Sequence, residues 1–277
     1  MIENPYVPYL GRLAAVETLG TGIKLFKVRF DDRAVAEAFR YQPGQFGFLS
    51  AFGVGEAPFG ITSVCGIDDT VDFAVAKVGT VTQALHGMNQ GDVVGVRGPM
   101  GNWFPMDQIK GKNVIVLGGG IGGAPLRPVI TSILHDRASY GDLTILWAAR
   151  NPRLLVFTEE YETWHQAPNT ALHLTVDEGD AGWTGHTGLI TQLLQKVGPN
   201  PDNATVIICG PPIMIHFAII ELQKMGFASE QIITTLEAKM KCGIGKCGRC
   251  NMGEKYVCLH GPVFSHAEIK GFLESFL

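Results

Sequence analysis

The sequence predicts an antiparallel β-barrel, then an α/β domain built on a parallel sheet, and finally a short cysteine-rich segment. Three observations support this fold class. Up to residue 107, short apolar or alternating runs are separated by turn residues, as in small barrels or sandwiches. From residue 113, strand-like apolar runs alternate with helix-like runs, as in parallel sheets whose faces are both covered. After residue 237 this periodicity ends in a cysteine-rich segment and a short tail.

The barrel is expected over residues 1–107. Its strands are predicted at IKLFKVRF, GQFGFLSAF, TVDFAVAKV and DVVGVRGP, and its turns at DD, PG, GVGEAP, GIDDT and NQGD. A short helix is predicted at 80–88. The stretch 97–113 is rich in residues that end helices and strands, which favours a domain boundary there.

The α/β domain is expected over 108–236, and the cysteine segment over 237–277. Strands are predicted at NVIVLGGG, LTILWAAR, ALHLTV, TVIICGPP and QIITTLEA. Helices are predicted at PVITSILHD, FTEEYETW, TGLITQLLQKV and IMIHFAIIELQKMG.

Composition narrows the class of protein. The 46 % hydrophobic and 17 % charged residues are those of an ordinary globular protein, and the net charge of −4 gives no electrostatic reason to expect a nucleic-acid partner. No apolar run approaches the roughly 18–20 residues that span a bilayer, so no membrane insertion is expected. The first residues lack the layout of a signal peptide, which predicts a cytoplasmic location.

A glycine-rich turn, VLGGGIGGAP, ends the first α/β strand and opens a helix. Gly118, Gly120 and Gly123 match the dinucleotide-binding pattern, in which glycines let the backbone approach a pyrophosphate at a helix N-terminus. A tight turn between strand and helix would also favour glycine. The strand–turn–helix context favours the nucleotide.

The acid that selects the nucleotide is displaced in this chain. The usual acid follows the second strand, where this sequence has AARN. The nearest acids are Asp177 and Glu178, after the third strand. An acid there could accept a hydrogen bond from a ribose 2′-hydroxyl and would repel a 2′-phosphate, which favours NADH over NADPH; the alternative is a solvated loop acid.

Two further stretches are candidate ligand contacts. ICGPP also follows a parallel strand, where open α/β sheets bind ligands, so Cys209 is either a nicotinamide contact or a small buried side chain. KVGTVTQAL places a glycine and a hydroxyl, Thr82, at a predicted helix start, which suits a second phosphate site.

The cysteines carry the strongest signal. Cys242, Cys247, Cys250 and Cys258 have the spacing C-x4-C-x2-C-x7-C, whose first half is the plant-type [2Fe–2S] arrangement. Zinc, which usually takes paired C-x2-C ligands, is the second possibility, and a disulfide is the third. Three interspersed glycines would let backbone amides donate to the sulfurs.

These motifs together resemble the ferredoxin-reductase-like flavoproteins with a C-terminal [2Fe–2S] segment, over essentially the whole chain. The resemblance rests on GEAP, VGTVT, GGGIGGAP, WTGHTG, CGPPIM and KCGIGKCGRCNMGEKYVC. The electron-transfer subunits of anaerobic sulfite reductase, of sulfhydrogenase (gamma) and of heterodisulfide reductase are similar. That of dihydroorotate dehydrogenase is more distantly similar.

The resemblance implies FAD on the barrel, NAD(H) on the α/β domain, and a [2Fe–2S] cluster on the last segment. By position, it implies flavin contacts at Ile61, Thr62 and Ser63 and FAD pyrophosphate contacts at Gly79, Val81 and Thr82. It implies nicotinamide-nucleotide contacts at Gly118, Gly119, Gly120, Gly122, Gly123, Ala124, Pro125, Asp177, Cys209, Gly210, Pro211 and Pro212. It implies iron ligation by the four cysteines above.

One motif departs from the wider superfamily. Its R-x-Y-S sequence corresponds here to APFG, so that Ala57 and Gly60 replace the arginine and the hydroxyl residue.

The implied activity is that of an NAD(P)H-dependent oxidoreductase whose cofactors perform the redox chemistry, so no catalytic acid or base is expected. The sequence offers no terminal substrate site, and the partner is therefore expected to be a redox subunit of a larger complex. A stand-alone NADH-dependent reductase of a diffusible acceptor is the alternative, followed by a zinc-binding regulator without redox activity.

Overall fold

The computed structural model describes residues 4–271. The chain divides into two compact units. The first unit comprises Met1–Trp103 and Glu237–Pro262, and the second comprises Phe104–Leu236 and Val263–Leu277. The part of the cysteine segment that contains the four cysteines, Glu237–Pro262, therefore belongs to the same unit as the predicted barrel, whereas the rest of the segment belongs to the second unit. The predicted boundaries at 107/108 and 236/237 stay predictions, and residues 1–3 and 272–277 of the first and last predicted segments lie outside the described residues.

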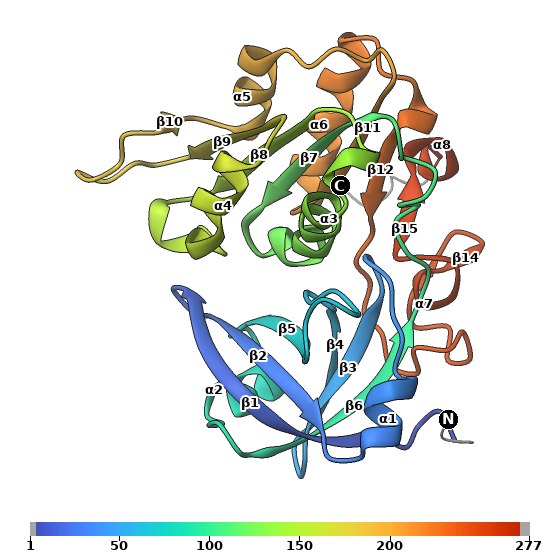
Figure 1. Cartoon of the computed structure of the whole chain (residues 1–277). Helices are drawn as coiled ribbons and strands as arrows, with labels where there is room; N and C mark the ends of the chain where they lie inside the picture. The colour runs from blue at the N-terminus through green and yellow to red at the C-terminus, as the bar shows by residue number, and fades with distance from the viewer. Residues whose placement is uncertain (1–3, 272–277) are drawn as a thin grey trace. The chain divides into compact units, whose positions relative to one another are not determined.

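The first unit contains a six-stranded antiparallel sheet in the order β4-β3-β6-β1-β2-β5 (Figure 1). Its elements are β1 (Tyr9–Gly20), β2 (Ile23–Phe30), α1 (Arg33–Ala38), β3 (Phe46–Ala51), β4 (Gly55–Gly60), β5 (Val71–Ala76), α2 (Thr80–His86) and β6 (Val93–Met100). An isolated antiparallel bridge between Ile61 and Phe73 joins the two edges of this sheet. The sheet is therefore barrel-like, as predicted.

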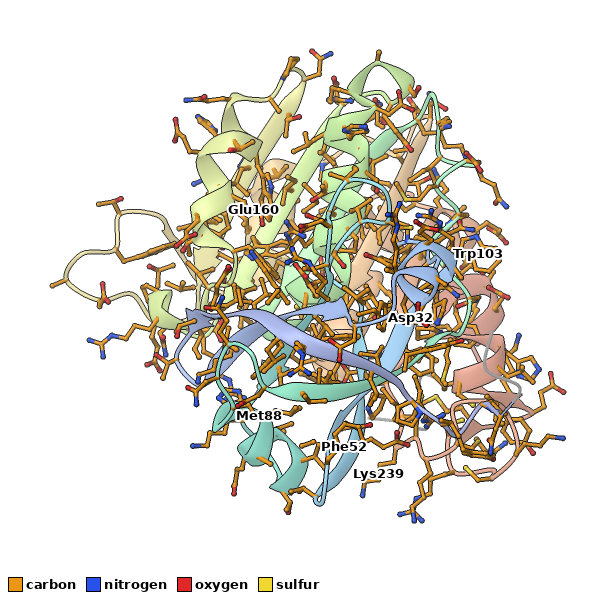
Figure 2. All side chains as sticks on the ribbon, turned by 60° about the horizontal axis from the view of Figure 1, so that its bottom comes forward. Asp32, Phe52, Met88, Trp103, Glu160 and Lys239 are labelled. Carbon is orange, nitrogen blue, oxygen red and sulfur yellow. The ribbon has the colours of Figure 1, made fainter. Side chains whose placement is uncertain are left out.

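Alternating side chains of these strands form the barrel core. Phe26, Val28, Leu49, Phe73 and Val96 are among its buried members, and Met88 after α2 packs against them (Figure 2). The turn predicted at GVGEAP is confirmed only for Gly53 and Val54, because β4 begins at Gly55. The sequence signal is misleading because Pro58 lacks an N–H, yet an edge strand such as β4 tolerates that loss.

The cysteine segment completes the first unit. It contains a two-stranded antiparallel ribbon, β13 (Asn251–Met252) and β14 (Lys255–Tyr256), followed by α7 (Val257–His260). Asn102 ties this segment to the end of β6: its amide N–H donates to the carbonyl of Gly261 at 2.7 Å, and its side chain donates to the carbonyl of His260 at 3.0 Å.

The second unit contains a seven-stranded sheet in the order β10-β9-β8-β7-β11-β12-β15. Its strands are β7 (Asn113–Gly119), β8 (Leu143–Ala149), β9 (Thr170–Val176), β10 (His186–Thr187), β11 (Ala204–Cys209), β12 (Ile232–Thr235) and β15 (Val263–Ser265). Its α-helices are α3 (Gly123–His135), α4 (Tyr161–Gln166), α5 (Ile190–Val197), α6 (Pro212–Lys224) and α8 (His266–Ile269). Its 3-10 turns are η1 (Gly120–Gly122), η2 (Arg137–Ser139), η3 (Pro152–Leu154), η4 (Thr158–Glu160) and η5 (Ser229–Gln231).

This sheet is parallel except at one edge. β15 pairs antiparallel with β12, with Thr234 opposite Phe264. The sequence pattern did not reveal β15, because three residues are too few to show a period of two. It did not reveal α8 either, because four residues make only about one helical turn. Elsewhere the predicted alternation of strands and helices is confirmed. Among residues 4–271, no helix is both long enough and apolar enough to cross a bilayer.

Candidate functional site

Residues 241–258 of the first unit, called the cysteine loop below, contain four thiols. Cys242, Cys250 and Cys258 are buried, whereas Cys247 is exposed. The side chains of Cys242 and Cys247 are in hydrogen-bond contact, and so are those of Cys250 and Cys258. Cys242 also interacts electrostatically with Cys258, so the two pairs lie close to each other. The structure therefore brings together all four cysteines that the sequence singled out.

Backbone amides point at the sulfurs of this loop. The amides of Ile244, Lys246 and Cys247 donate to the Sγ atom of Cys242 at 3.5, 3.3 and 3.4 Å. The amide of Gly245 donates to Cys258 Sγ at 3.2 Å. Such donors stabilise thiolates, which are the form that binds metal.

Three glycines give the loop this shape. Gly243, Gly245 and Gly248 have φ values of 77°, 71° and 69°, in the left-handed region that favours glycine. The curl expected from their spacing is therefore present. Two of the three also meet neighbours: a Cβ on Gly243 would overlap Met100, and one on Gly245 would lie 3.0 Å from Leu259.

Burial and hydrogen bonding give two of these thiols different pKa values. Burial opposes ionisation of Cys242, but the amides of Ile244, Cys247 and Lys246 outweigh it and lower the pKa of this thiol to about 6. Burial, together with the neighbouring Cys250, raises the pKa of the Cys258 thiol to about 12.

Within residues 4–271, no three His, Cys, Asp or Glu side chains converge as they do around a single metal ion. The four thiols instead make two side-chain contacts, Cys242 with Cys247 and Cys250 with Cys258.

The glycine-rich turn of the second unit lies at the centre of its sheet. The chain leaves β7 toward β8 on one side, and β11 occupies the other side of β7. This reversal is the topological switch point at which open α/β sheets bind ligands, beyond the carboxyl ends of the strands. Gly118 and Cys209 are directly opposite each other in the parallel pair β7–β11.

Packing explains most of the glycines in this turn. A Cβ on Gly122 would lie 2.5 Å from Gly210 Cα and 2.6 Å from the carbonyl oxygen of Cys209. The two loops thus touch through their backbones. A Cβ on Gly119 would overlap Met214, a side chain that also covers Gly210.

Trp147 leaves no room for a side chain at two more of these glycines. Its buried indole would be 2.6 Å from a Cβ on Gly118 and would also overlap one on Gly123. The indole packs at 5.3 Å and 73° on Trp164, and its Nε1 donates to the carbonyl of Val156 at 3.3 Å. No sequence motif singled out Trp147; a bulky residue in the strand beside a glycine turn was the available signal.

Gly120 differs from the other glycines of the turn. Its φ is 55°, and a Cβ built on it would meet no atom within 4 Å. It therefore borders open space. The remaining predicted contacts of this unit begin helices: Ala124 and Pro125 lie in the first turn of α3, whereas Pro211 and Pro212 start α6.

Cys209 and Asp177 occupy different parts of the same sheet edge. The Cys209 thiol is buried and accepts a hydrogen bond from Thr235 Oγ1 at 2.9 Å. Asp177 is exposed after β9, two strands from β7, and its amide donates to the carbonyl of Ala149. Arg150, which follows β8, is also exposed and lies between them in strand order.

The predicted flavin contacts lie in the barrel. Ile61, Thr62 and Ser63 are all at most 1 % exposed. Ser63 Oγ hydrogen-bonds Tyr41 at 2.7 Å and accepts from the amide of Asp72 at 2.9 Å. Half-buried residues of β4 directly before them, including Phe59 and Gly60, are the more accessible part of this strip, and no sequence motif selected Phe59.

The predicted pyrophosphate contacts lie at the start of α2. Gly79 precedes the helix, and Val81 is in its first turn. Thr82 Oγ1 accepts hydrogen bonds from the amides of Val78 and Gly79 at 2.9 and 2.8 Å and donates to the Gly79 carbonyl. The Thr82 hydroxyl therefore forms hydrogen bonds with the backbone of its own turn. The amides of Thr80 and Val81 are the donors that a helix start leaves available.

Known proteins share both halves of this arrangement. The profile of the family described as "Oxidoreductase NAD-binding domain" matches residues 116–219. The profile described as "Iron-sulfur cluster binding domain of dihydroorotate dehydrogenase B" matches residues 237–270. The first match contains the glycine-rich turn, and the second contains all four cysteines of the loop.

Solved structures share the fold. A chain from the NADH-dependent reduced ferredoxin–NADP oxidoreductase matches with a TM-score of 0.75 at 23 % identity, covering 96 % of this chain and 93 % of that one. A ferredoxin NADP+ reductase from Neisseria gonorrhoeae, solved with bound FAD and NADP, matches with a TM-score of 0.69 at 19 % identity, covering 81 % and 96 %. At these identities the likeness shows the fold alone.

Two curated relatives match over nearly their whole length. Sulfhydrogenase 1 subunit gamma of Pyrococcus furiosus is 38 % identical over 274 residues, which are 96 % of this chain and 94 % of the relative. The probable dihydroorotate dehydrogenase B (NAD(+)) electron transfer subunit of Methanocaldococcus jannaschii is 32 % identical over 271 residues, covering 97 % and 93 %. The chain therefore belongs to the family of oxidoreductase electron-transfer subunits with an NAD-binding and an iron–sulfur domain that includes these two relatives.

Proposed function

We propose that this chain relays electrons between NAD(H), FAD and a [2Fe–2S] cluster, to or from the catalytic subunit of a larger complex. The observation that carries the proposal is the cysteine loop, where four thiols form two close pairs and backbone amides point at their sulfurs. Bound there, the cluster supplies one-electron chemistry. The chain's own residues hold it and set its surroundings.

Cys242, Cys247, Cys250 and Cys258 would hold the cluster, and the contacts between Cys242 and Cys247 and between Cys250 and Cys258 suggest the pairs in which they would do so. Amide donors to Cys242 and Cys258 stabilise the negative charge of bound thiolates.

The nicotinamide nucleotide is assigned to the second unit. Gly120 and the first turn of α3 would hold its pyrophosphate, because Gly120 borders open space and a helix start attracts anions. The loop Cys209–Pro212, which touches Gly122, would lie beside it. Asp177 accepts a hydrogen bond from the adenosine ribose, which favours NADH, whereas the neighbouring Arg150 would tolerate a 2′-phosphate.

FAD is assigned to the first unit. The N. gonorrhoeae reductase with this fold was solved with bound FAD. The amides at Thr80 and Val81 are the available phosphate donors, since the superfamily's arginine is replaced by Ala57. Phe59 and Gly60 of β4, together with the buried stretch Ile61–Ser63, would hold the flavin ring.

A partner subunit completes the relay. Both curated relatives described above are subunits by name. The partner docks where Cys247, the exposed ligand, offers the shortest path for electrons. It is a subunit of sulfite reductase, hydrogenase or heterodisulfide reductase type. A cytoplasmic location is consistent with four cysteines kept as thiolate ligands, which a reducing compartment preserves.

The test is the cofactor content of anaerobically purified protein. Wild type is expected to contain about two irons, two acid-labile sulfides and one FAD per chain, from the composition of the proposed cofactors. Cys258→Ser should lose most of the iron and sulfide and keep FAD. Cys65→Ser, a matched control in the same unit but outside the loop, should keep all three. Zinc in place of iron would contradict the proposal and favour a regulator without redox activity.

A further inference from the structure

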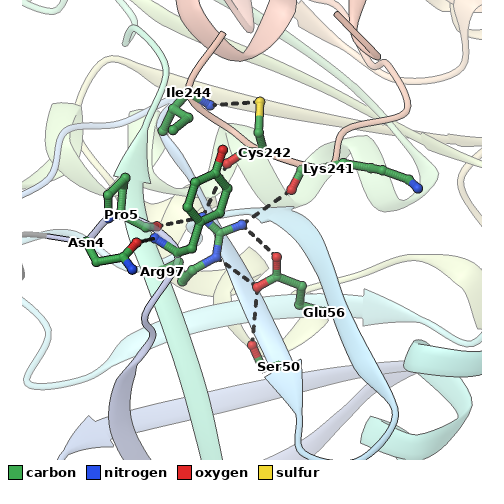
Figure 3. Close-up of polar contacts among 9 residues, drawn as sticks. Asn4, Pro5, Ser50, Glu56, Arg97, Lys241, Cys242 and Ile244 are labelled. Carbon is green, nitrogen blue, oxygen red and sulfur yellow. Dashed lines mark hydrogen bonds and ion pairs between the residues drawn. The ribbon is translucent and has the colours of Figure 1, made fainter. Parts of the chain in front are cut away.

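Arg97 of β6 is a fully buried cation beside the cysteine loop. Its side chain is 2 % exposed, and its partners come from three segments that are distant in sequence (Figure 3). A guanidinium removed from water is strongly destabilising unless its N–H groups are bonded and its charge is paired. Its retention at this position therefore requires a specific set of contacts.

Glu56 of β4 supplies the charge partner. Arg97 Nε donates to Glu56 Oε2 at 2.9 Å, and Nη2 donates to Oε1 at 2.6 Å. Both bonds use the planar fork that only arginine offers. The guanidinium also lies over the ring of Phe48, 4.4 Å from its centroid.

Three further hydrogen bonds of Arg97 go to backbone carbonyls, two of which are at the start of the cysteine loop. Nη1 donates to the carbonyls of Pro5 at 2.9 Å and Cys242 at 3.3 Å, and Nη2 donates to the carbonyl of Lys241 at 3.4 Å. One side chain thus connects the backbone of the first cysteine ligand to β4. This strand leads directly into the stretch assigned to the flavin.

The charges of this pair are screened unequally. Arg97 is buried, whereas the Glu56 side chain is 33 % exposed. Water therefore weakens the field of the carboxylate more than that of the guanidinium. When the cluster gains one electron it gains one negative charge, which a nearby buried cation stabilises. Removing the cation should disfavour reduction, and removing the carboxylate should favour it.

We propose that Arg97 is a positioning residue that fixes the cysteine loop to β4 and raises the reduction potential of the cluster. The inference rests on the proposed function, because it requires a cluster at the four cysteines. It goes further by assigning a tuning role to a residue that touches no sulfur.

The test compares four variants and one control variant with wild type. Arg97→Gln removes the cation, Glu56→Gln removes the carboxylate, and the double variant removes both. Arg97→Lys keeps the charge but loses the fork. Arg29→Gln, which removes an exposed cation from β2 of the same barrel, is the matched control for net charge. Each protein is assayed for iron content, for midpoint potential by EPR-monitored titration with dithionite, and for hydrogen exchange of the amides of residues 244–247.

We expect opposite shifts from the two single variants. Arg97→Gln should lower the midpoint potential, Glu56→Gln should raise it, and the double variant should return toward wild type. Arg97→Lys should stay near the wild-type potential. Its loop amides should exchange about tenfold faster than those of wild type, the factor expected for losing one charge-assisted hydrogen bond. Arg29→Gln should change neither quantity.

Equal potentials and equal exchange in all cluster-bearing variants would overturn the inference while leaving the proposed function intact. Shifts of the same sign in both single variants would also overturn it, since they would report general disruption. If Arg97→Gln cannot retain iron, the midpoint potential of Glu56→Gln and the amide exchange of Arg97→Lys still test the inference. A wild-type chain without iron would instead refute the proposed function and this inference together.

Discussion

The glycine-rich turn of the second unit and the cysteine loop of the first unit look alike in sequence but use glycine for different reasons. In the turn, Gly118, Gly122 and Gly123 are required because neighbouring atoms leave no room for a Cβ. In the loop, Gly245 and Gly248 are required because φ is positive. Glycine density alone therefore does not distinguish close packing from backbone shape.

This difference matters for function. Close packing brings the β7–α3 and β11–α6 loops into backbone contact, whereas Gly120, just before α3, borders open space. Positive φ angles instead turn amides inward, where they donate to sulfur. One arrangement suits an incoming anion that leaves again, and the other suits an anionic group that stays bound.

The largest effect is expected at the packed turn. In Gly122→Ala the new Cβ meets only backbone atoms, which cannot move aside, so the second unit should lose about 3 kcal/mol of unfolding free energy. Gly120→Ala is the matched control. It needs only a left-handed alanine and should cost about 1 kcal/mol. Urea unfolding followed by tryptophan fluorescence measures both, and equal losses would contradict the packing explanation.

The next effect is expected in the cysteine loop. Gly243→Ala combines a positive φ with overlap against Met100 and Phe48, so the loop should shift and the purified protein should lose at least about half of its iron. Gly248→Ala has a similar φ but no atom within 4 Å of the new Cβ, and it should keep most of the iron. The iron content per chain after anaerobic purification, measured for both variants, tests this prediction. An equal loss of iron in both variants would show that φ, and not contact with the barrel, determines the shape of the loop.

The smallest effect is expected at Asp177, which follows β9. Asp177→Asn should weaken the preference for NADH over NADPH by about tenfold, the value of one hydrogen bond to a charged group. The ratio of kcat/KM for the two nucleotides, with an artificial electron acceptor, measures it. Arg150→Gln should move the ratio in the opposite direction. An unchanged ratio in Asp177→Asn would show that this acid is only a solvated loop residue.

Most of the fold could be predicted from periodicity, because the strands and helices of both units repeat their apolar residues regularly. Several strands were missed: β1, although it has twelve residues, β4, which contains Pro58, and β15, which has only three residues. The association of the cysteine segment with the barrel depends on side chains such as Arg97, whose partners at Glu56 and Cys242 are distant in sequence. No local pattern reports such contacts.

The candidate site was predictable to different degrees. The four cysteines could be found from spacing alone, because cysteine is one of the few residue types that bind metal and these four all lie between residues 242 and 258. The glycine turn could be located, but not the role of each glycine, since Trp147 and Gly210 come from other parts of the sheet. The use of the Thr82 hydroxyl within its own turn also depends on the folded backbone.

An anaerobic titration of the purified protein with NADH, followed by absorption and EPR, tests the proposed relay most directly. We expect bleaching of a flavin band near about 450 nm together with a rhombic S = 1/2 signal, since NADH would reduce both cofactors. A colourless protein without an EPR signal after NADH, and with zinc at the cysteines, would contradict the relay.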